Sequence, residues 1–274
     1  MKTTRRVQIT AVVVLVAAIA AVVEAHGSAA RRTVRTSVGT VVATIEISPN
    51  SGDLAVGAGA VWATSDAVPI LMRIDPATNT VVAREPIAAK NACLDLPGSC
   101  GEAAAGNGAL WIARVSDDTV LRIDPSDNSL AAAIPVGHQP EGVATTPGAV
   151  WVVNRGGPSV SRIDPTTNTV VATVRIAPAQ DCCSDHMAVA AGAGAVWVSL
   201  PSTDSIVRID PATNTVVAMV HLSGHPCAFL AAGAHRVWAA GGHCSGSLMR
   251  IEGRSNKPAG AVNGTAVPVG VCIS

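Results

Sequence analysis

The feature that most constrains this chain is an eleven-residue sequence, RIDPATNTVVA, which occurs identically at residues 73–83 and 208–218. Near copies begin at Arg122 and Arg162, and a weaker copy, RIEG, begins at Arg250. A tryptophan in a short apolar run precedes each copy by 11 residues, or by 12 in the last: Trp62, Trp111, Trp151, Trp197 and Trp238. Successive tryptophans are 49, 40, 46 and 41 residues apart, so the chain contains five tandem units of one supersecondary structure.

The third unit shows how four strands fit into one repeat. Residues 142–144 predict a short first strand, and the apolar run 149–153 predicts a second strand that is packed on both faces. Residues 159–164 predict a third strand, and residues 169–176 predict a fourth strand in which apolar and polar side chains alternate. Four-stranded units of about this length are typical of propeller blades, so we expect an all-β protein with a β-propeller fold.

A tight turn is predicted between the third and fourth strands. Asp164 accepts backbone hydrogen bonds at its first position, Pro165 restricts φ at the second, and Asn168 tolerates a left-handed conformation at its end. We therefore interpret the repeated arginine and aspartate of RIDP as structural corner residues and the five tryptophans as core residues between blades. Neither set is expected to be an active site.

The ends of the repeat region predict how the ring closes. Residues 40–47, TVVATIEI, match the fourth strand but precede the first complete unit, and residues 267–272, VPVGVC, resemble a first strand after the fifth unit. A propeller protects its edges by closing the ring, so we expect these two segments to share a composite closing blade. Six blades are the prediction, and a shortened form of a seven-bladed propeller remains the alternative.

The N-terminal residues predict export. Lys2, Arg5 and Arg6 precede an apolar run over residues 11–23, which is short for a transmembrane helix, and small residues follow. We assign residues 1–30 to a signal peptide and its junction, and residues 31–274 to a single β-propeller domain. The mature protein is expected to be secreted or in the cell envelope without stable membrane insertion, although an uncleaved anchor remains the alternative.

Composition and cysteine content fit that assignment. The chain is 49% hydrophobic and 14% charged, with 19 basic and 19 acidic residues, no Tyr and one Phe, so nucleic acid is not an expected partner. Its seven cysteines would lie in an oxidising compartment, where disulfides are the usual state. We predict the pairs Cys227–Cys244 and Cys93–Cys100, and no metal site. The partners of Cys182, Cys183 and Cys272 stay open.

Units of the form GAGAVWVS followed by SIVRIDPATNTVVA resemble the YVTN-type, or YncE-like, β-propeller repeats of exported bacterial proteins. The resemblance covers about residues 40–263. It implies a propeller that is distantly similar to streptogramin lyases such as virginiamycin B lyase. For those enzymes the resemblance implies an elimination assisted by Mg²⁺, a histidine and nearby glutamates. The nearest such pair here is His138 with Glu141.

Binding sites of propellers usually lie on one rim, in the loops before first strands and those between second and third strands. The polar candidates there are His138, Glu141, Asn154, Arg155, His186, His225 and His243. We expect a monomeric binding module for a protein, a glycan or a small ligand, without catalysis or cofactor. The alternatives are a Mg²⁺-dependent lyase that uses the rim His and Glu residues, and a structural envelope protein without a discrete ligand.

Overall fold

The computed structural model describes residues 43–47, 51–65, 70–86, 100–177, 186–223, 226–241 and 247–263. These residues form five four-stranded antiparallel sheets, which we call blades 1 to 5 in chain order. Each blade consists of four consecutive strands that lie side by side in the order of the chain. In the described ranges the only other regular elements are two short 3-10 turns.

The strand bounds follow the repeat. Blade 1 contains β1 (Ser51–Gly57), β2 (Ala60–Ser65), β3 (Ile70–Asp75) and β4 (Thr80–Pro86). Blade 2 contains β5 (Cys100–Gly106), β6 (Ala109–Arg114), β7 (Thr119–Ile123) and β8 (Leu130–Pro135), with the turn η1 (Val115–Asp117) between β6 and β7. Blade 3 contains β9 (Pro140–Thr146), β10 (Ala149–Asn154), β11 (Ser159–Asp164) and β12 (Thr169–Arg175).

Blade 4 contains β13 (Val189–Gly192), β14 (Ala195–Leu200), β15 (Ser205–Asp210) and β16 (Thr215–His221), with the turn η3 (Pro201–Thr203) between β14 and β15. Blade 5 contains β17 (Pro226–Ala232), β18 (Arg236–Gly241), β19 (Ser247–Glu252) and β20 (Lys257–Asn263). The five units and the four strands predicted for the third unit are confirmed, and β9 is longer than predicted.

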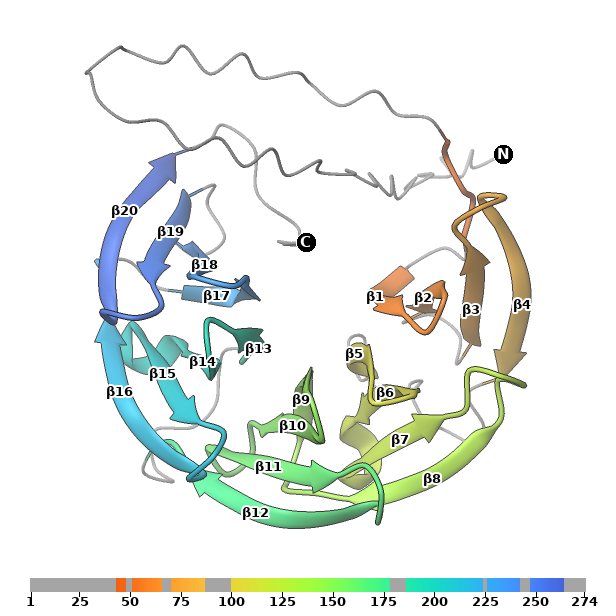
Figure 1. The fold of residues 1–274 in the computed structure, drawn as a ribbon, viewed down its shortest axis with the longest axis horizontal. Coiled ribbons are helices and arrows are strands. Elements are labelled where there is room, and N and C mark those ends of the chain that lie inside the picture. Colours follow the sequence, from red (N-terminus) through yellow and green to blue (C-terminus); the bar gives the residue numbers. More distant parts are fainter. Residues whose placement is uncertain are drawn as a thin grey trace, which may run out of the picture.

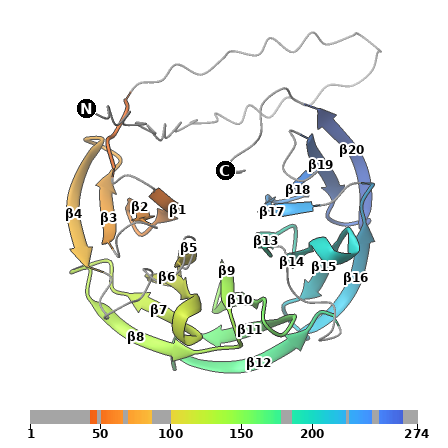
Figure 2. The ribbon, with the colours of Figure 1, turned by 180° about the vertical axis from the view of Figure 1, so that it is seen from behind.

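The blades follow one another around a common centre. The first strands β1, β5, β9, β13 and β17 lie on the inside, and the fourth strands β4, β8, β12, β16 and β20 lie on the outside (Figure 1). The view from behind shows the same order (Figure 2). In blade 3 the loop before β9 and the loop between β10 and β11 lie side by side, where the N–H of Arg155 donates to the carbonyl oxygen of Gln139.

Position in the blade explains the composition of each strand. The second strands β6, β10 and β14 are buried along their whole length because neighbouring blades cover both faces. The outer strand β4 alternates between exposed and partly buried residues, as a strand with one solvated face does. The alternation predicted for residues 169–176 is likewise present in β12.

The tryptophans lie between blades, as predicted. Trp62, Trp111, Trp151 and Trp197 are at most 1% exposed and belong to four apolar clusters that each join two neighbouring blades. Each buried indole N–H also donates a hydrogen bond within its own blade, for example from Trp111 to the carbonyl oxygen of Gly106 at 2.9 Å. The packing is therefore apolar, and the one polar atom of each ring is satisfied.

The tight turn predicted between the third and fourth strands is confirmed as well. In blade 3 the Asp164 carboxylate accepts the N–H of Thr166 at 2.8 Å, and Asn168 has a left-handed φ of 56°. The corresponding aspartates Asp75, Asp124 and Asp210 accept the same bond in their own blades. The hydroxyl and the N–H of Thr166 lower the pKa of Asp164, so this corner is stabilised by the ionised carboxylate.

The repeated arginine joins each blade to the next one. The guanidinium of Arg122 lies 5.5 Å from the centre of the Trp111 ring, and its Nη1 donates to the carbonyl oxygen of Pro165 at 3.0 Å and to Oδ1 of Asn168 at 2.8 Å. The last two residues are the corner of blade 3. Arg73, Arg162 and Arg208 make corresponding contacts with Pro125, Asn214 and Asn256. The arginine is thus structural, but it contacts the neighbouring blade and not only its own corner.

Several predictions from the sequence lie outside the described residues. They include the signal peptide over residues 1–30, the strand over 267–272, and the side chains of all seven cysteines. Of the strand predicted over residues 40–47, only 43–47 are described, and they form no strand. The disulfides, the export signal and the number of blades beyond five therefore stay predictions. Among the described residues, no helix is long and apolar enough to cross a bilayer.

Candidate functional site

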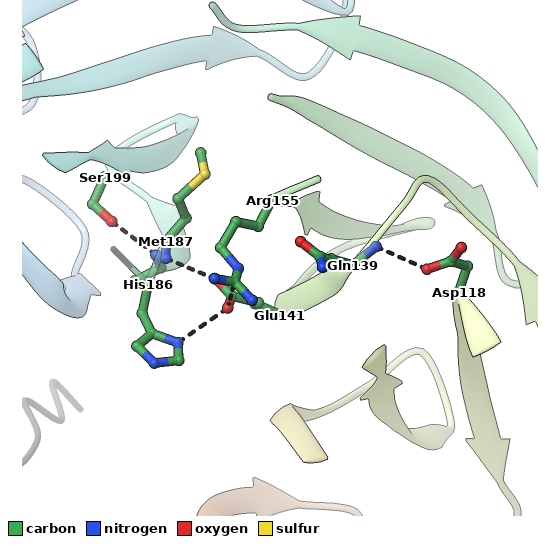
Figure 3. Close-up of polar contacts among 8 residues, drawn as sticks. Asp118, Gln139, Glu141, Arg155, His186, Met187 and Ser199 are labelled. Carbon is green, nitrogen blue, oxygen red and sulfur yellow. Dashed lines mark hydrogen bonds and ion pairs between the residues drawn. The ribbon is translucent and has the colours of Figure 1, made fainter. Parts of the chain in front are cut away.

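The candidate site is built around Glu141, the second residue of β9 in blade 3. Its side chain is 9% exposed, and both of its carboxylate oxygens have partners. Oε1 lies 2.8 Å from Nε of Arg155 and 3.0 Å from Nδ1 of His186, while Oε2 accepts the N–H of Met187 at 2.9 Å (Figure 3). One carboxylate therefore holds two side chains and the backbone of the next blade.

The partners of Glu141 come from two different blades. Arg155 follows β10 of blade 3, and its N–H donates to the carbonyl oxygen of Gln139 at 2.9 Å. His186 begins the segment that leads into β13 of blade 4, where Ser199 anchors the backbone. The Ser199 hydroxyl accepts the N–H of Ala188 at 2.8 Å, and the Ser199 N–H donates to the Ala188 carbonyl oxygen at 3.0 Å. The buried Glu141 thus holds the His186 ring, and the buried Ser199 holds the backbone two residues after it.

A second acid and histidine pair lies in the loop before β9. Asp118 follows η1 of blade 2 in a left-handed conformation, with φ of 56°. Its carboxylate contacts Nδ1 of His138 at 3.0 Å and accepts the N–H of Gln139 at 2.8 Å. Partial burial raises the pKa of Asp118, but these two hydrogen bonds outweigh burial and the pKa lies below its usual value. Asp118 is therefore ionised at neutral pH, and His138 is tied to blade 2.

Two glycines make room for this arrangement. A Cβ at Gly156 would come within 2.3 Å of Cδ2 of His138, and a Cβ at Gly137 would come within 2.5 Å of Cγ of Asn154. Asn154 itself is fully buried, and its amide nitrogen donates to the hydroxyls of Ser159 and Ser161 at 3.2 and 2.9 Å. Asn154 therefore packs against the buried side of the loop before β9, at Gly137, whereas the His138 side chain is exposed on the surface.

Both histidines are exposed although their orientation is constrained. The side chain of His138 is 64% exposed and that of His186 is 68% exposed. An ionised carboxylate only accepts hydrogen bonds, so the ring nitrogen that faces it carries the proton. Each imidazole is thus oriented through Nδ1 and turns the rest of its ring toward solvent. This combination of exposure and fixed orientation suits contact with a ligand.

Further carboxyl groups lie on the inner strands beside Glu141. Asp53 of β1 accepts the N–H of Ala103 in blade 2 at 2.6 Å. Glu102 of β5 is partly exposed and lies over Gly142 of blade 3, where a Cβ would be 3.1 Å from its Oε2. Desolvation, followed by the charges of Asp53 and Glu141, raises the pKa of Glu102 well above its usual value. Glu102 therefore keeps its proton to higher pH than an ordinary glutamate.

The structure brings together some of the predicted site residues. Glu141, Arg155 and His186 form one cluster, His138 pairs with Asp118, and Asn154 lies beneath the same loop. His225 and His243 lie outside the described residues, so their place is not tested.

The sequence prediction did not include Asp118, Asp53 and Glu102. Asp118 lies in a loop between second and third strands, a class of loop already assigned to the rim. Asp53 and Glu102 both stand four residues before the glycine that ends their strand, so aligning the repeats could have found them.

The Mg²⁺ implied by the resemblance to streptogramin lyases does not fit this cluster. Mg²⁺ prefers six ligands, mostly oxygens, in an octahedral arrangement. Both oxygens of Glu141 already contact Arg155, His186 and the Met187 N–H. Within the described part of the chain, no three His, Cys, Asp or Glu side chains converge as metal ligands. The described residues therefore do not build a Mg²⁺ site here.

Comparison with solved structures agrees with the architecture. A streptogramin B lyase structure superposes with a TM-score of 0.66 at 12% identity, over 81% of this chain and 73% of that chain. Virginiamycin B lyase from Staphylococcus aureus superposes with a TM-score of 0.64 at 13% identity, over the same shares. Hydrazine synthase from Kuenenia stuttgartiensis reaches a TM-score of 0.52 at 18% identity, over 64% of this chain and 51% of that chain.

No family model matches the sequence, and no curated protein matches it either. At sequence identities this low, the structural similarity establishes the fold but not the activity. Five four-stranded antiparallel sheets around a common centre, together with these likenesses, show that the chain is an all-β protein with a multi-blade β-propeller fold.

Proposed function

We propose that this chain is an exported propeller of the YVTN type that binds a hydroxyl-rich ligand, such as a glycan, on the rim of blades 2, 3 and 4. The observation that carries the proposal is the pair of exposed histidines that acids hold in place, His138 by Asp118 and His186 by the buried Glu141. Orienting polar groups in advance reduces the entropy lost on binding. Export itself rests on the N-terminal sequence.

The chemistry of the rim favours a ligand that donates hydrogen bonds. A neutral imidazole that donates from Nδ1 presents Nε2 as an acceptor. The Asp118 carboxylate beside His138 is also an acceptor, whereas Glu141 and Arg155 are engaged with each other. Sugar hydroxyls can donate to such acceptors, which makes a glycan a better match than an acidic ligand. A protein or another small polar ligand would need the same donors.

A glycan array tests this proposal directly. The purified mature protein is compared with His138→Ala, His186→Ala and the control His235→Ala, which changes an exposed histidine in the turn between β17 and β18. We expect the wild type and His235→Ala to bind the same glycans, and each rim variant to bind at least about tenfold more weakly, the loss of one hydrogen bond in a binding site. Absence of glycan binding, or equal binding by all four proteins, would overturn the proposal.

A second candidate function, an elimination reaction, is favoured by the contact between Glu141 and His186. An acid that fixes an exposed imidazole is a common arrangement for a general base, which removes a proton from a bound substrate. The fold likeness to virginiamycin B lyase supplies a first substrate to try. Loss of virginiamycin B, followed by liquid chromatography with mass spectrometry so that a product of equal mass is separated, should occur with the wild type and disappear with His186→Ala. No loss of the compound with the wild type would exclude this substrate.

A further inference from the structure

We propose that Gly157 determines which ligands fit the rim of blade 3. Its open backbone forms the floor on which the glycan lies between His138 and His186, and its N–H binds a sugar oxygen. The proposal rests on the proposed function and adds to it the place of the ligand and a residue that selects the ligand. The class of ligand that follows is a neutral sugar, as the contacts of the turn around Gly157 indicate.

The turn at residues 155–158, between β10 and β11, packs against the loop that carries His138. The N–H of Gly156 donates to the carbonyl oxygen of His138 at 2.9 Å, and a Cβ added to Gly156 would lie 2.3 Å from Cδ2 of the His138 ring. The N–H of Arg155 donates to the Gln139 carbonyl oxygen, also at 2.9 Å. One side of the turn is therefore in direct contact with the first histidine.

The other side of the turn reaches the second histidine through Glu141. Nε of Arg155 lies 2.8 Å from Oε1 of Glu141, and that oxygen lies 3.0 Å from Nδ1 of His186. Arg155 and Glu141 lie between His186 and Asp118, the partner of His138 (Figure 3). The turn is thus placed between two oriented imidazoles that come from the entry loops of two neighbouring blades.

Gly157 leaves the middle of this turn open. No atom lies within 4 Å of a Cβ added to Gly157, and its φ lies outside the left-handed region. Neither the space nor the backbone conformation therefore requires a glycine at this position. A side chain here would project into the open space beside the turn, which is the space that a ligand between the two histidines would occupy.

The backbone N–H of Gly157 is available to such a ligand. Among the described residues it donates no hydrogen bond, whereas the N–H groups of Arg155 and Gly156 both do. The next residue, Pro158, is buried, and its carbonyl oxygen accepts the N–H of Ile176 at 3.0 Å. The turn is thus fixed on both sides of Gly157. An unpaired N–H needs water or another acceptor, and a ligand oxygen can replace that water without reordering the backbone.

The donors and acceptors around the turn together select the ligand. Nε2 of each neutral histidine accepts a hydrogen bond, and the Gly157 N–H donates one. The ligand therefore needs donors for the two histidines and an acceptor for Gly157. Sugar hydroxyls supply both functions, whereas a protonated amine only donates and a carboxylate only accepts. A neutral glycan is thus favoured over a polyamine and over an acidic sugar.

A bulky side chain at Gly157 tests the proposal. The glycan array is repeated with Gly157→Trp and with the control Ala77→Trp, which carries the same side chain on the exposed corner of blade 1. We expect Gly157→Trp to bind the neutral glycans of the wild type at least about tenfold more weakly, with a melting temperature within about 2 °C of the wild type. Ala77→Trp should bind them as the wild type does.

The outcomes separate this proposal from the proposed function. If Gly157→Trp binds as tightly as the wild type while His138→Ala and His186→Ala lose binding, the proposed function stands and the role of Gly157 is wrong. Tightest binding of the wild type to acidic glycans would also contradict that role. A wild type that binds no glycan would overturn both.

A second measurement needs no bulky residue. Nuclear magnetic resonance of protein made with isotope-labelled glycine follows each glycine N–H, and each signal is identified by its absence from the matching glycine-to-alanine variant. Titration with the neutral glycan that binds most tightly on the array should shift the signal of Gly157. The signal of Gly108, in the β5–β6 turn at the other end of the strands, should not shift. An unchanged Gly157 signal at saturating glycan would overturn the proposal, whatever the effect of Gly157→Trp.

Discussion

At the scale of single residues, the carboxyl groups of the inner strands have different tasks. Asp53 accepts the N–H of Ala103 in blade 2, and Glu141 accepts the N–H of Met187 in blade 4, so each stabilises a contact with the next blade. Glu102 lies between them without a hydrogen bond from the described residues. Its ionised form therefore has the cost of desolvation and of repulsion by Asp53 and Glu141 without a compensating hydrogen bond.

Glu102→Gln should therefore make the protein more stable at neutral pH. The pKa of Glu102 is raised in the folded protein, so its ionisation destabilises the fold progressively as pH rises above the value in the unfolded chain, about 4.3. The free energy of unfolding of the variant, measured with urea, should exceed that of the wild type at pH 7. The difference should vanish below about pH 3, where the glutamate is protonated in both states. A variant less stable than the wild type at pH 7 would show that Glu102 has a favourable partner.

Removing the carboxylate of Glu141 should have the opposite effect. Glu141→Gln keeps an acceptor for the Met187 N–H but loses the charge that faces Arg155, which is left partly buried. We expect a loss of about 3 kcal/mol, in the range for breaking a buried ion pair. Glu252→Gln is the matched control, because the Glu252 side chain is 37% exposed and its ion pairs contribute about 1 kcal/mol or less. Equal stability of the two variants would contradict a structural role for Glu141.

At the scale of strands, close approach of the inner strands explains the glycines of the repeat. A Cβ at Gly192, the last residue of β13, would lie 2.5 Å from the carbonyl oxygen of Ala232 in blade 5. At Gly106, the last residue of β5, it would lie 2.3 Å from Oγ1 of Thr145 in blade 3. The atom that blocks a Cβ at Gly192 belongs to the backbone, which cannot rotate away as the Thr145 side chain near Gly106 can.

Gly192→Ala should cost about 1–3 kcal/mol of stability because the inner strands of blades 4 and 5 would have to move apart. The measurement is urea unfolding at neutral pH. Gly157→Ala serves as the control, since no atom lies within 4 Å of its added Cβ, and it should change stability by less than about 0.5 kcal/mol. If Gly192→Ala unfolded at the same urea concentration as the control, the inner strands would have to be further apart than described.

At the scale of the whole molecule, the repeated arginines make contacts between blades that all run from one blade to the next one along the chain. Each of Arg73, Arg122, Arg162 and Arg208 lies over the tryptophan of its own blade and contacts the corner of the following blade. The contacts run from blade 1 to blade 5 and never backward in the described residues. Stability is therefore shared between neighbouring blades, as in other repeat proteins.

Replacing an arginine that joins two blades should cost more than replacing Arg250. Arg122→Ala loses a cation–π contact and two hydrogen bonds to blade 3, so we expect a loss of about 2–3 kcal/mol. Arg250→Ala loses a bond within blade 5 and an exposed ion pair, and the expected loss is about 1 kcal/mol. Calorimetry of both variants gives the comparison. A larger loss for Arg250→Ala would mean that Arg250 has a neighbour beyond blade 5.

Local signals in the sequence determined the blades. The apolar run around each tryptophan, the alternation in residues 169–176 and the chemistry of Asp164, Pro165 and Asn168 act over a few residues, so they predict strands and corners without knowledge of the rest. Repetition then indicated the propeller. The same reasoning identified the rim loops that hold His138 and His186.

Only the tertiary structure decided which residues meet between blades. Glu141 contacts His186 although 45 positions separate them, and Arg122 passes its own corner to reach Asn168. Asp118 pairs with His138, and the raised pKa of Glu102 depends on charges from the two neighbouring blades. These contacts follow from the distance and angle at which one twisted sheet packs on the next. A single unit carries no record of that geometry, so its sequence predicts the blade but not the partners of its polar side chains.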